Sequence, residues 1–163
     1  MSFEFHNLAV RVGDPVETWG TGGILAALER GTIREWSRIA RAVMNDPWGP
    51  VARDLEEVIE FSRPLDDDSL LGEGNLALME GVLERARREA AERERDVVAR
   101  EVGALITQSG LVRREFASRI GTSASRLSTY ESGSVTPSAA LMVRMRRVAT
   151  EGLPDRAAVP AKK

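Results

Sequence analysis

The chain has 163 residues, of which 42% are hydrophobic and 29% charged, so it is long enough for one globular domain, or two small ones, with a real core. It contains no cysteine, which excludes disulfides and thiolate metal sites and is compatible with a reducing cytoplasm. No apolar run approaches the roughly 20 residues that cross a membrane. The N-terminal MSFEFHNLAV also lacks the basic start of a signal peptide, so we expect a cytoplasmic protein without a membrane segment.

Charge is unevenly distributed along the chain, although its net value is only −2. Residues 51–100 hold 14 acidic and 8 basic residues, a balance of −6, whereas residues 101–150 hold 3 acidic and 7 basic residues, a balance of +4. Contacts to DNA phosphates need positive charge. The charge pattern therefore separates an acidic module from a basic segment that could bind nucleic acid.

The first residues show little periodicity. Residues 1–18 could form a short strand or an extended arm, and the single histidine, His6, fits a surface position better than a ligand or base role. The glycines of WGTGGILAALERG neither follow a strand nor precede a Lys-Ser/Thr pair. They therefore indicate entry into a helix rather than a phosphate-binding loop.

Two short helices are predicted next. The first covers residues 24–30 and stops at Gly31, and the second covers residues 33–44 behind a capping box formed by Thr32 and Glu35. The apolar residues of the second helix recur at helical spacing: Ile33, Trp36, Ile39, Ala40 and Val43.

A third helix is expected to start at Asp46 and Pro47, which resemble an N-cap followed by proline. Its buried side is predicted to consist mostly of Trp48, Val51, Leu55, Val58, Ile59 and Phe61. All three tryptophans, Trp19, Trp36 and Trp48, lie on or beside an apolar face in this part of the chain. A small helical core explains them best, and the alternative places a tryptophan in the groove of a partner.

Residues 62–74 interrupt the helices with a proline, two glycines and aspartates 66–68. A calcium loop would alternate its ligands and end in a spaced glutamate, so an acidic linker or helix N-cap fits this run better. From about residue 75 to 109 only two isolated glycines occur, which predicts one long helix. Its middle, ERARREAAERERD, is almost all charged or alanine, as in helices that bridge two bodies through solvent, and a coiled-coil dimer remains an alternative.

The most informative stretch is RREFASRIGTSASRLSTYESG, which begins at Arg113. A short helix fits its first eight residues, and Gly121 can adopt the left-handed conformation that ends it. Thr122 or Ser123 can then cap a second helix that runs to about Glu131. Three further residues have the size or apolar character needed where two helices pack: Ala117, Leu127 and Tyr130.

Residues 102–149, with SGLVRREFASRIG, TSASRLSTYESG and VTPSAALMVRMRRVA, resemble the DNA-binding domain of the λ-repressor, Cro and Xre family. The resemblance implies a helix-turn-helix whose second helix lies in the major groove of operator DNA, followed by a last helix over residues 139–150. It also implies a structural role for Glu131, paired with an arginine such as Arg119. An ordinary helical hairpin without a DNA role is the alternative.

The resemblance places candidate contacts on the second helix and around it. The positions expected to read bases are Ala124, Ser125, Thr129 and, as the longest polar side chain, Arg126, which could contact guanine or phosphate. The positions expected to bind phosphates are Arg113, Arg114, Ser123, Ser128, Ser132 and Ser134. The arginines of the last helix either join them or form a solvated face: Arg144, Arg146 and Arg147. Because no base-reading position is glutamine or asparagine, discrimination per base pair is expected to be modest.

The whole chain, with WGTGGILAALERGTIREW, NDPWGPVARDLEE and the basic C-terminal segment, looks like actinobacterial antitoxins encoded beside nucleotidyltransferase-like toxins. This implies the antitoxin of a type II-like or type IV-like system that represses its own operon. Its acidic module would hold the toxin, with Trp19, Trp36 and Trp48 as candidate partner-binding residues. Two alternatives stay open: a plain dimeric repressor whose N-terminal module dimerises or senses a ligand, and a protein-interaction adaptor without DNA binding.

The predicted architecture is all-α. It has a small helical module over residues 1–74, a connecting helix over 75–100, a five-helix λ-repressor-like domain over 101–150 and a flexible tail over 151–163. Neither H-E-x-x-H nor G-x-S-x-G occurs, and no residue pattern indicates an enzyme, a metal or a cofactor. The expected partners are double-stranded operator DNA, a co-encoded toxin and a second copy of the chain.

Overall fold

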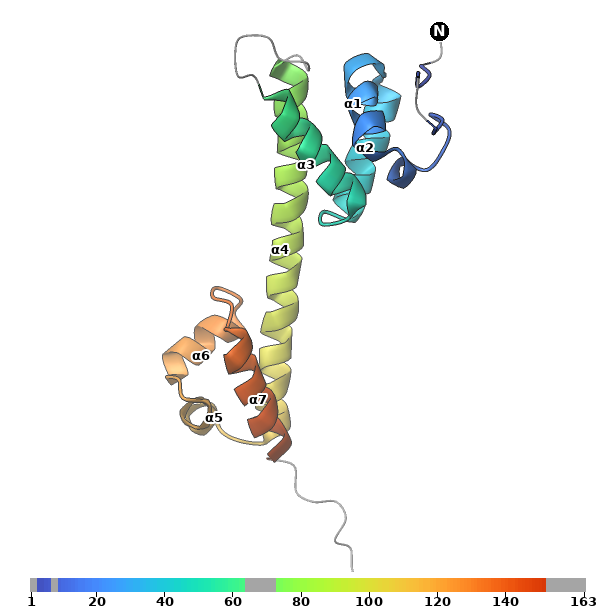
Figure 1. Ribbon diagram of the computed structural model, residues 1–163. Coiled ribbons are helices and arrows are strands. Elements are labelled where there is room, and N and C mark those ends of the chain that lie inside the picture. Colours follow the sequence, from blue (N-terminus) through green and yellow to red (C-terminus); the bar gives the residue numbers. More distant parts are fainter. Residues whose placement is uncertain (1–2, 7–8, 64–72, 152–163) are drawn as a thin grey trace, which may run out of the picture. The chain divides into compact units, whose positions relative to one another are not determined.

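The computed structural model describes residues 3–6, 9–63 and 73–151, and these residues form seven α-helices, one 3₁₀ helix and no strand (Figure 1). The prediction of an all-α fold is confirmed for this part of the chain. The aspartates 66–68 and the tail after residue 151 lie outside the described residues.

The chain divides into two compact units, unit 1 (residues 1–91) and unit 2 (residues 92–163). The long helix α4 (Glu73–Ser109) contributes residues to both of them. The middle of α4, residues 92–97, exposes every side chain, as its nearly all-polar sequence predicts.

Unit 1 is a bundle in which three short helices pack on one another and on the start of α4 (Figure 1). Its elements before α4 are η1 (Val16–Thr18), α1 (Gly20–Arg30), α2 (Ile33–Asn45) and α3 (Pro50–Ser62). The core consists of their apolar stripes together with the first stripe of α4: Val16, Trp19, Ile24, Ala27, Leu28, Ile39, Val43, Val51, Ala52, Leu55, Val58, Ile59, Leu76, Met79, Leu83 and Ala86.

The boundary between α1 and α2 follows the local signals of the sequence. Gly31 ends α1, and the N–H of Thr32 donates to the Glu35 carboxylate at 2.9 Å while the Thr32 hydroxyl accepts from the N–H of Arg34. Burial of Glu35 acts to raise the pKa of its carboxyl, but the hydrogen bonds from Thr32 outweigh burial, and the pKa is lowered overall. The predicted capping box is confirmed.

The predicted start of the third helix is wrong by three residues. Asp46 ends α2, and α3 begins at Pro50 behind Gly49 as its N-cap. A Cβ on Gly49 would lie 2.1 Å from the Asp46 carboxylate, so a larger residue there would displace the side chain of Asp46. Trp48 therefore lies in the loop before α3, and its side chain is 54% exposed rather than buried.

Two further residues assigned to apolar stripes are exposed because the stripes run through other positions. The buried side of α3 recurs at Val51, Leu55, Val58 and Ser62, which leaves Phe61 68% exposed. In α2 the buried positions are spaced by four residues from Glu35, and Ile33 in the first turn is 72% exposed.

Unit 2 consists of the end of α4 with α5 (Arg113–Ile120), α6 (Ala124–Glu131) and α7 (Ala139–Glu151). Within the described residues of this unit there are four helical segments, one fewer than the five expected. They share one core: Val102, Leu105, Ile106, Phe116, Ala117, Ile120, Leu127, Tyr130, Leu141, Met142, Met145, Val148 and Ala149. The bounds of α5 agree with the sequence prediction, and the hydroxyl of Ser138 accepts from the N–H of Leu141 at 3.2 Å at the start of α7.

Candidate nucleic-acid interface

A short turn with a left-handed glycine joins α5 to α6. Gly121 has φ 77° and ψ 38°, the left-handed conformation, and the N–H of Thr122 donates to the carbonyl of Ala117 at 2.9 Å. Ser123 is the N-cap of α6, and its hydroxyl accepts from the N–H of Arg126 at 3.1 Å. Of the two predicted caps, Ser123 is the one used, and the roles of Gly121 and Ala117 agree with the prediction.

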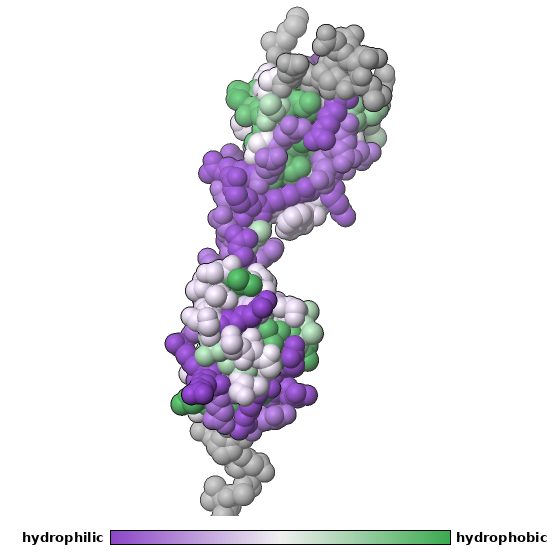
Figure 2. Space-filling model, turned by 90° about the vertical axis from the view of Figure 1, so that its left-hand side faces the viewer, coloured by the Kyte–Doolittle hydropathy of each residue, from purple (hydrophilic) through white to green (hydrophobic). Residues whose placement is uncertain are grey.

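The outer face of α6 is built from small residues and one arginine. Ala124, Ser125, Arg126 and Ser128 are exposed, whereas Leu127 and Tyr130 are buried in the core of unit 2. Figure 2 views the α5–α6 side of unit 2, where weakly polar, pale residues cover much of the surface between charged groups. Such a surface allows close approach to the base edges in a groove, since no long side chain other than Arg126 projects from it.

Thr129 has less freedom than its position suggests. It is half-buried, and its hydroxyl donates to the carbonyl of Arg126 at 2.8 Å. The hydroxyl proton is therefore committed to the helix backbone, which leaves Thr129 only the acceptor lone pairs of its oxygen and a methyl group for a base.

The arginines at the start of α5 differ in what they contact. Arg113 donates to the Glu131 carboxylate at 2.6 Å, which joins the start of α5 to the end of α6. The expected partner of Glu131, Arg119, instead pairs with Glu115 one turn earlier in α5, at 2.9 Å. Arg114 is exposed and has no carboxylate partner in the part of the chain that the structure describes. Arg114 is thus better placed than Arg113 to neutralise a phosphate.

The serines expected to bind phosphates surround α6 and are all exposed. Ser123 has committed an acceptor lone pair to the cap, while Ser132 donates to the carbonyl of Thr129 at 3.2 Å and lies 2.8 Å from the hydroxyl of Ser134. Ser128 makes no side-chain hydrogen bond to any described residue. A phosphate at this end of α6 would meet hydroxyl groups already held by short local bonds.

Two of the three arginines of α7 bond to other helices of unit 2. Arg144 donates to the carbonyl of Ile120, the last residue of α5, at 2.8 Å. Arg146 pairs with Glu101 of α4 at 2.7 Å, and Arg147 lies 3.7 Å from Glu151. The role of Arg144 was missed from the sequence because its partner is a main-chain carbonyl 24 residues away, for which no sequence pattern exists.

The three tryptophans of unit 1 are in different environments. Trp19 is 3% exposed, donates to the carbonyl of Asp14 and lies 4.6 Å from the guanidinium of Arg38, and the indole of Trp36 donates to the carbonyl of Ala27. Both are fixed inside unit 1. Only the exposed Trp48, with Arg87 over its ring at 5.0 Å, presents much of its surface to a partner.

Arg87 also forms a bidentate ion pair with Glu56. Its guanidinium donates to both carboxylate oxygens of Glu56, at 2.5 and 2.7 Å, and the hydrogen bond with Arg87 lowers the pKa of the Glu56 carboxyl. Arg87 of α4 thus contacts both Glu56 of α3 and the ring of Trp48.

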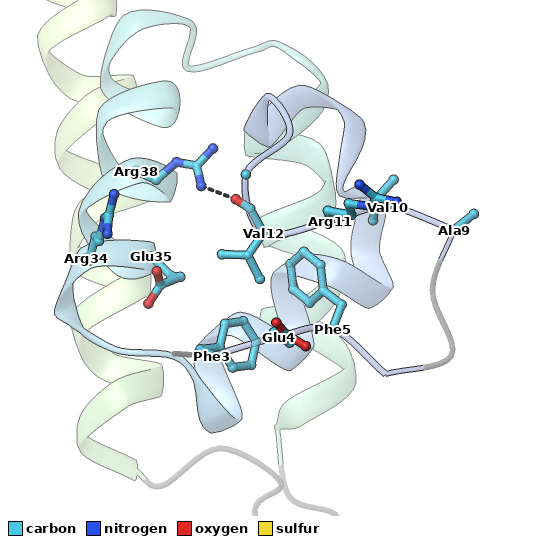
Figure 3. Close-up of a pocket in the computed structure, with 11 residues that line it drawn as sticks. Phe3, Glu4, Phe5, Ala9, Val10, Arg11, Val12, Arg34, Glu35 and Arg38 are labelled. Atoms are coloured by element: carbon cyan, nitrogen blue, oxygen red, sulfur yellow. Dashed lines mark hydrogen bonds between the residues drawn. The ribbon is translucent and has the colours of Figure 1, made fainter. Parts of the chain in front are cut away.

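Residues of the N-terminal arm and of α2 line an open pocket of 930 Å³ (Figure 3). Phe3 and Phe5 contribute its apolar wall, and Arg34 and Arg38 come from α2. Arg38 is already bound to the carbonyls of Val12 and Asp14 of the arm. The hydrogen bonds of Arg38 thus hold the arm beside α2 and shape this pocket. Its volume is sufficient for a small molecule.

No described helix is long and apolar enough to cross a membrane, and no group of three or more potential ligand side chains in the described ranges could hold a metal ion. Comparison of the chain with protein-family models, with curated proteins and with solved structures gave no match.

Proposed function

We propose that this protein is a sequence-specific DNA-binding transcriptional regulator whose helix α6 enters the major groove. The observation that carries the proposal is the outer face of α6. Ala124, Ser125, Arg126 and Ser128 lie there without any acidic side chain, and the one carboxylate of α6, that of Glu131, is bound to Arg113. Such a helix, which is capped by Ser123 and follows the left-handed turn at Gly121, has the size and charge that the major groove of DNA accommodates.

The electrostatics of unit 2 support the same proposal. Four of its arginines are matched by carboxylates, namely Arg113, Arg119, Arg146 and Arg147. The positive charges of Arg114, Arg126 and Arg144 have no carboxylate partner among the residues described. This modest excess is enough for a few phosphate contacts, and we therefore propose that two copies act together on a two-fold operator.

We further propose that the protein acts in the cytoplasm as an antitoxin that represses its own operon, with unit 1 as the surface for a co-encoded toxin. Toxins that act on nucleic acid or nucleotides often present basic surfaces, and the acidic balance of residues 51–100 complements such a surface. The exposed Trp48 gives this surface an aromatic anchor of the kind enriched in protein interfaces. In this proposal the protein has no catalytic role.

A selection experiment tests the DNA-binding proposal. The full chain is incubated at low salt with duplexes of random sequence, bound duplexes are sequenced, and affinity is then measured over a range of salt concentrations. We expect enrichment of a two-fold sequence and an affinity that falls with salt. Arg114→Ala should weaken binding, whereas Arg53→Ala, which removes an exposed arginine of unit 1, serves as the matched control. Absence of DNA binding by the wild-type chain at low salt would refute the proposal.

The pocket of unit 1 favours one alternative, a repressor whose N-terminal module senses a small molecule. The pocket places the rings of Phe3 and Phe5 near the charged group of Arg34, so that a small molecule could meet both kinds of contact. A ligand that raises the melting temperature of unit 1 and changes operator affinity would favour this alternative over the antitoxin.

A further inference from the structure

One side chain on the outer face of α6 is held by another residue of the same helix. The Nε of Arg126 donates to the hydroxyl oxygen of Tyr130 at 2.9 Å. The two residues are four positions apart, so their side chains lie one above the other on the helix. Tyr130 is 5% exposed and belongs to the core of unit 2, so its hydroxyl is a fixed point rather than a mobile surface group.

This hydrogen bond uses only Nε and leaves the two terminal nitrogens of the Arg126 guanidinium available. Both terminal nitrogens, Nη1 and Nη2, have no partner in the described residues. They form a planar fork that matches the two acceptors, O6 and N7, on the major-groove edge of guanine. A flexible arginine loses much conformational entropy on binding, and Tyr130 has already removed part of that freedom.

The other exposed groups of α6 cannot supply comparable specificity. Ala124 offers only a methyl group, Ser125 and Ser128 carry single hydroxyls that suit several bases, and the hydroxyl proton of Thr129 is committed to the backbone. Arg126 is therefore the one residue on this face, as the structure describes it, that can recognise a base through two hydrogen bonds.

We propose that Arg126 reads a guanine in each operator half-site and that Tyr130 is the positioning residue that aims it. The inference rests on the proposed DNA-binding function. A phosphate role is less favoured by the geometry, because Tyr130 lies one turn towards the C-terminus and draws the guanidinium along the axis of α6. Arg126 also lies in the first turn of α6, and the N-terminal residues of a recognition helix are those that contact base edges.

The test measures binding of the full-length protein to the duplex that random-sequence selection enriches. It also measures binding to duplexes in which each position carries each of the four bases in turn. The proteins compared are wild type, Arg126→Ala, Arg126→Lys and Tyr130→Phe. We expect wild type to prefer guanine at one position per half-site by about 5- to 150-fold, which corresponds to about 1–3 kcal/mol. Arg126→Ala should abolish the preference at that position alone, and Arg126→Lys should reduce it because lysine has no fork.

Tyr130→Phe keeps the buried ring and removes only the hydroxyl, so it separates positioning from packing. We expect it to reduce the guanine preference several-fold, with affinity for random DNA and the slope of log K against log salt unchanged. In the double variant with Arg126→Ala, Tyr130→Phe should have no further effect on base preference. If Tyr130 had a purely structural role, its replacement would have an effect in the double variant as well.

Each contrary result has a distinct meaning. If Arg126→Ala weakens all duplexes equally and lowers the salt slope, Arg126 binds phosphate and the inference is wrong. If Tyr130→Phe keeps the full guanine preference, the positioning role is wrong. A wild-type protein that binds DNA without preferring guanine overturns this inference alone, whereas a protein that binds no DNA overturns the proposed function as well.

Discussion

Replacing Gly121 by alanine should destabilise unit 2 through the backbone and through one neighbouring side chain. The left-handed conformation of Gly121 costs an L-residue about 1–2 kcal/mol. The new Cβ would also lie 3.1 Å from Nη1 of Arg144, the nitrogen that binds the carbonyl of Ile120. If Arg144 moves away, a further loss of about 1 kcal/mol is expected from that partly exposed hydrogen bond.

Two other glycines serve as matched controls. Gly133 is also left-handed, with φ 74°, but a Cβ there meets only ordinary contacts from 3.6 Å, so Gly133→Ala should show the backbone cost without the arginine effect. Gly103 lies inside α4 with no atom within 4 Å of a Cβ, so Gly103→Ala should stabilise unit 2 by about 0.4–1 kcal/mol.

Hydrogen exchange measures these effects unit by unit. A loss of about 1–3 kcal/mol, the upper end applying if Arg144 moves, should raise the exchange of the α5 and α6 amides by about 5- to 160-fold where they exchange through opening of unit 2. All three tryptophans lie in unit 1, so their fluorescence transition is an internal control that should not move. If Gly121→Ala left the α5 and α6 amides as protected as in wild type, a left-handed residue would not be needed at this turn.

Three further results are expected. Arg114→Ala should reduce the slope of log K against log salt by about 0.9 in DNA-binding titrations, and Arg113→Ala by less, because Glu131 already neutralises Arg113; equal effects would contradict this. Thr32→Ala should destabilise unit 1 by about 1 kcal/mol in urea followed by tryptophan fluorescence. The loss should be largest above the ordinary pKa of glutamate and shrink as pH falls through the lowered pKa of Glu35; a loss independent of pH would argue against the capping box as its cause. Trp48→Ala should weaken capture of the product of the neighbouring gene with little change in stability, and capture that is unaffected would place the partner surface elsewhere.

The sequence predicts those features of unit 2 that depend on neighbouring residues. The bounds of α5, the left-handed Gly121 and the serine cap of α6 each depend on a few adjacent positions, and each is found as predicted. The ion pair of Glu131 with Arg113 was assigned to the wrong arginine. Its two members are 18 residues apart and meet only once the helices have packed.

The errors in unit 1 have a similar origin. The run NDPWGP contains two prolines, each preceded by a possible N-cap, and the local signal does not decide between them. In the structure Asp46 is the C-cap of α2 and Gly49 is the N-cap of α3, so the helix starts at the second proline and Trp48 lies outside it. Phe61 was misplaced because Ser62, a weaker apolar signal, takes the inward position on α3.

The share of α4 in the core of unit 1 has a consequence for synthesis on the ribosome. Leu76, Met79, Leu83 and Ala86 complete that core, so the first three helices cannot bury their inner faces while the chain is still shorter than α4 requires. A nascent chain that stalls near residue 74 would present unprotected apolar surface to chaperones and proteases. A ribosome-bound chain stalled with residues 1–91 exposed should instead resist proteolysis, because unit 1 can then close on itself.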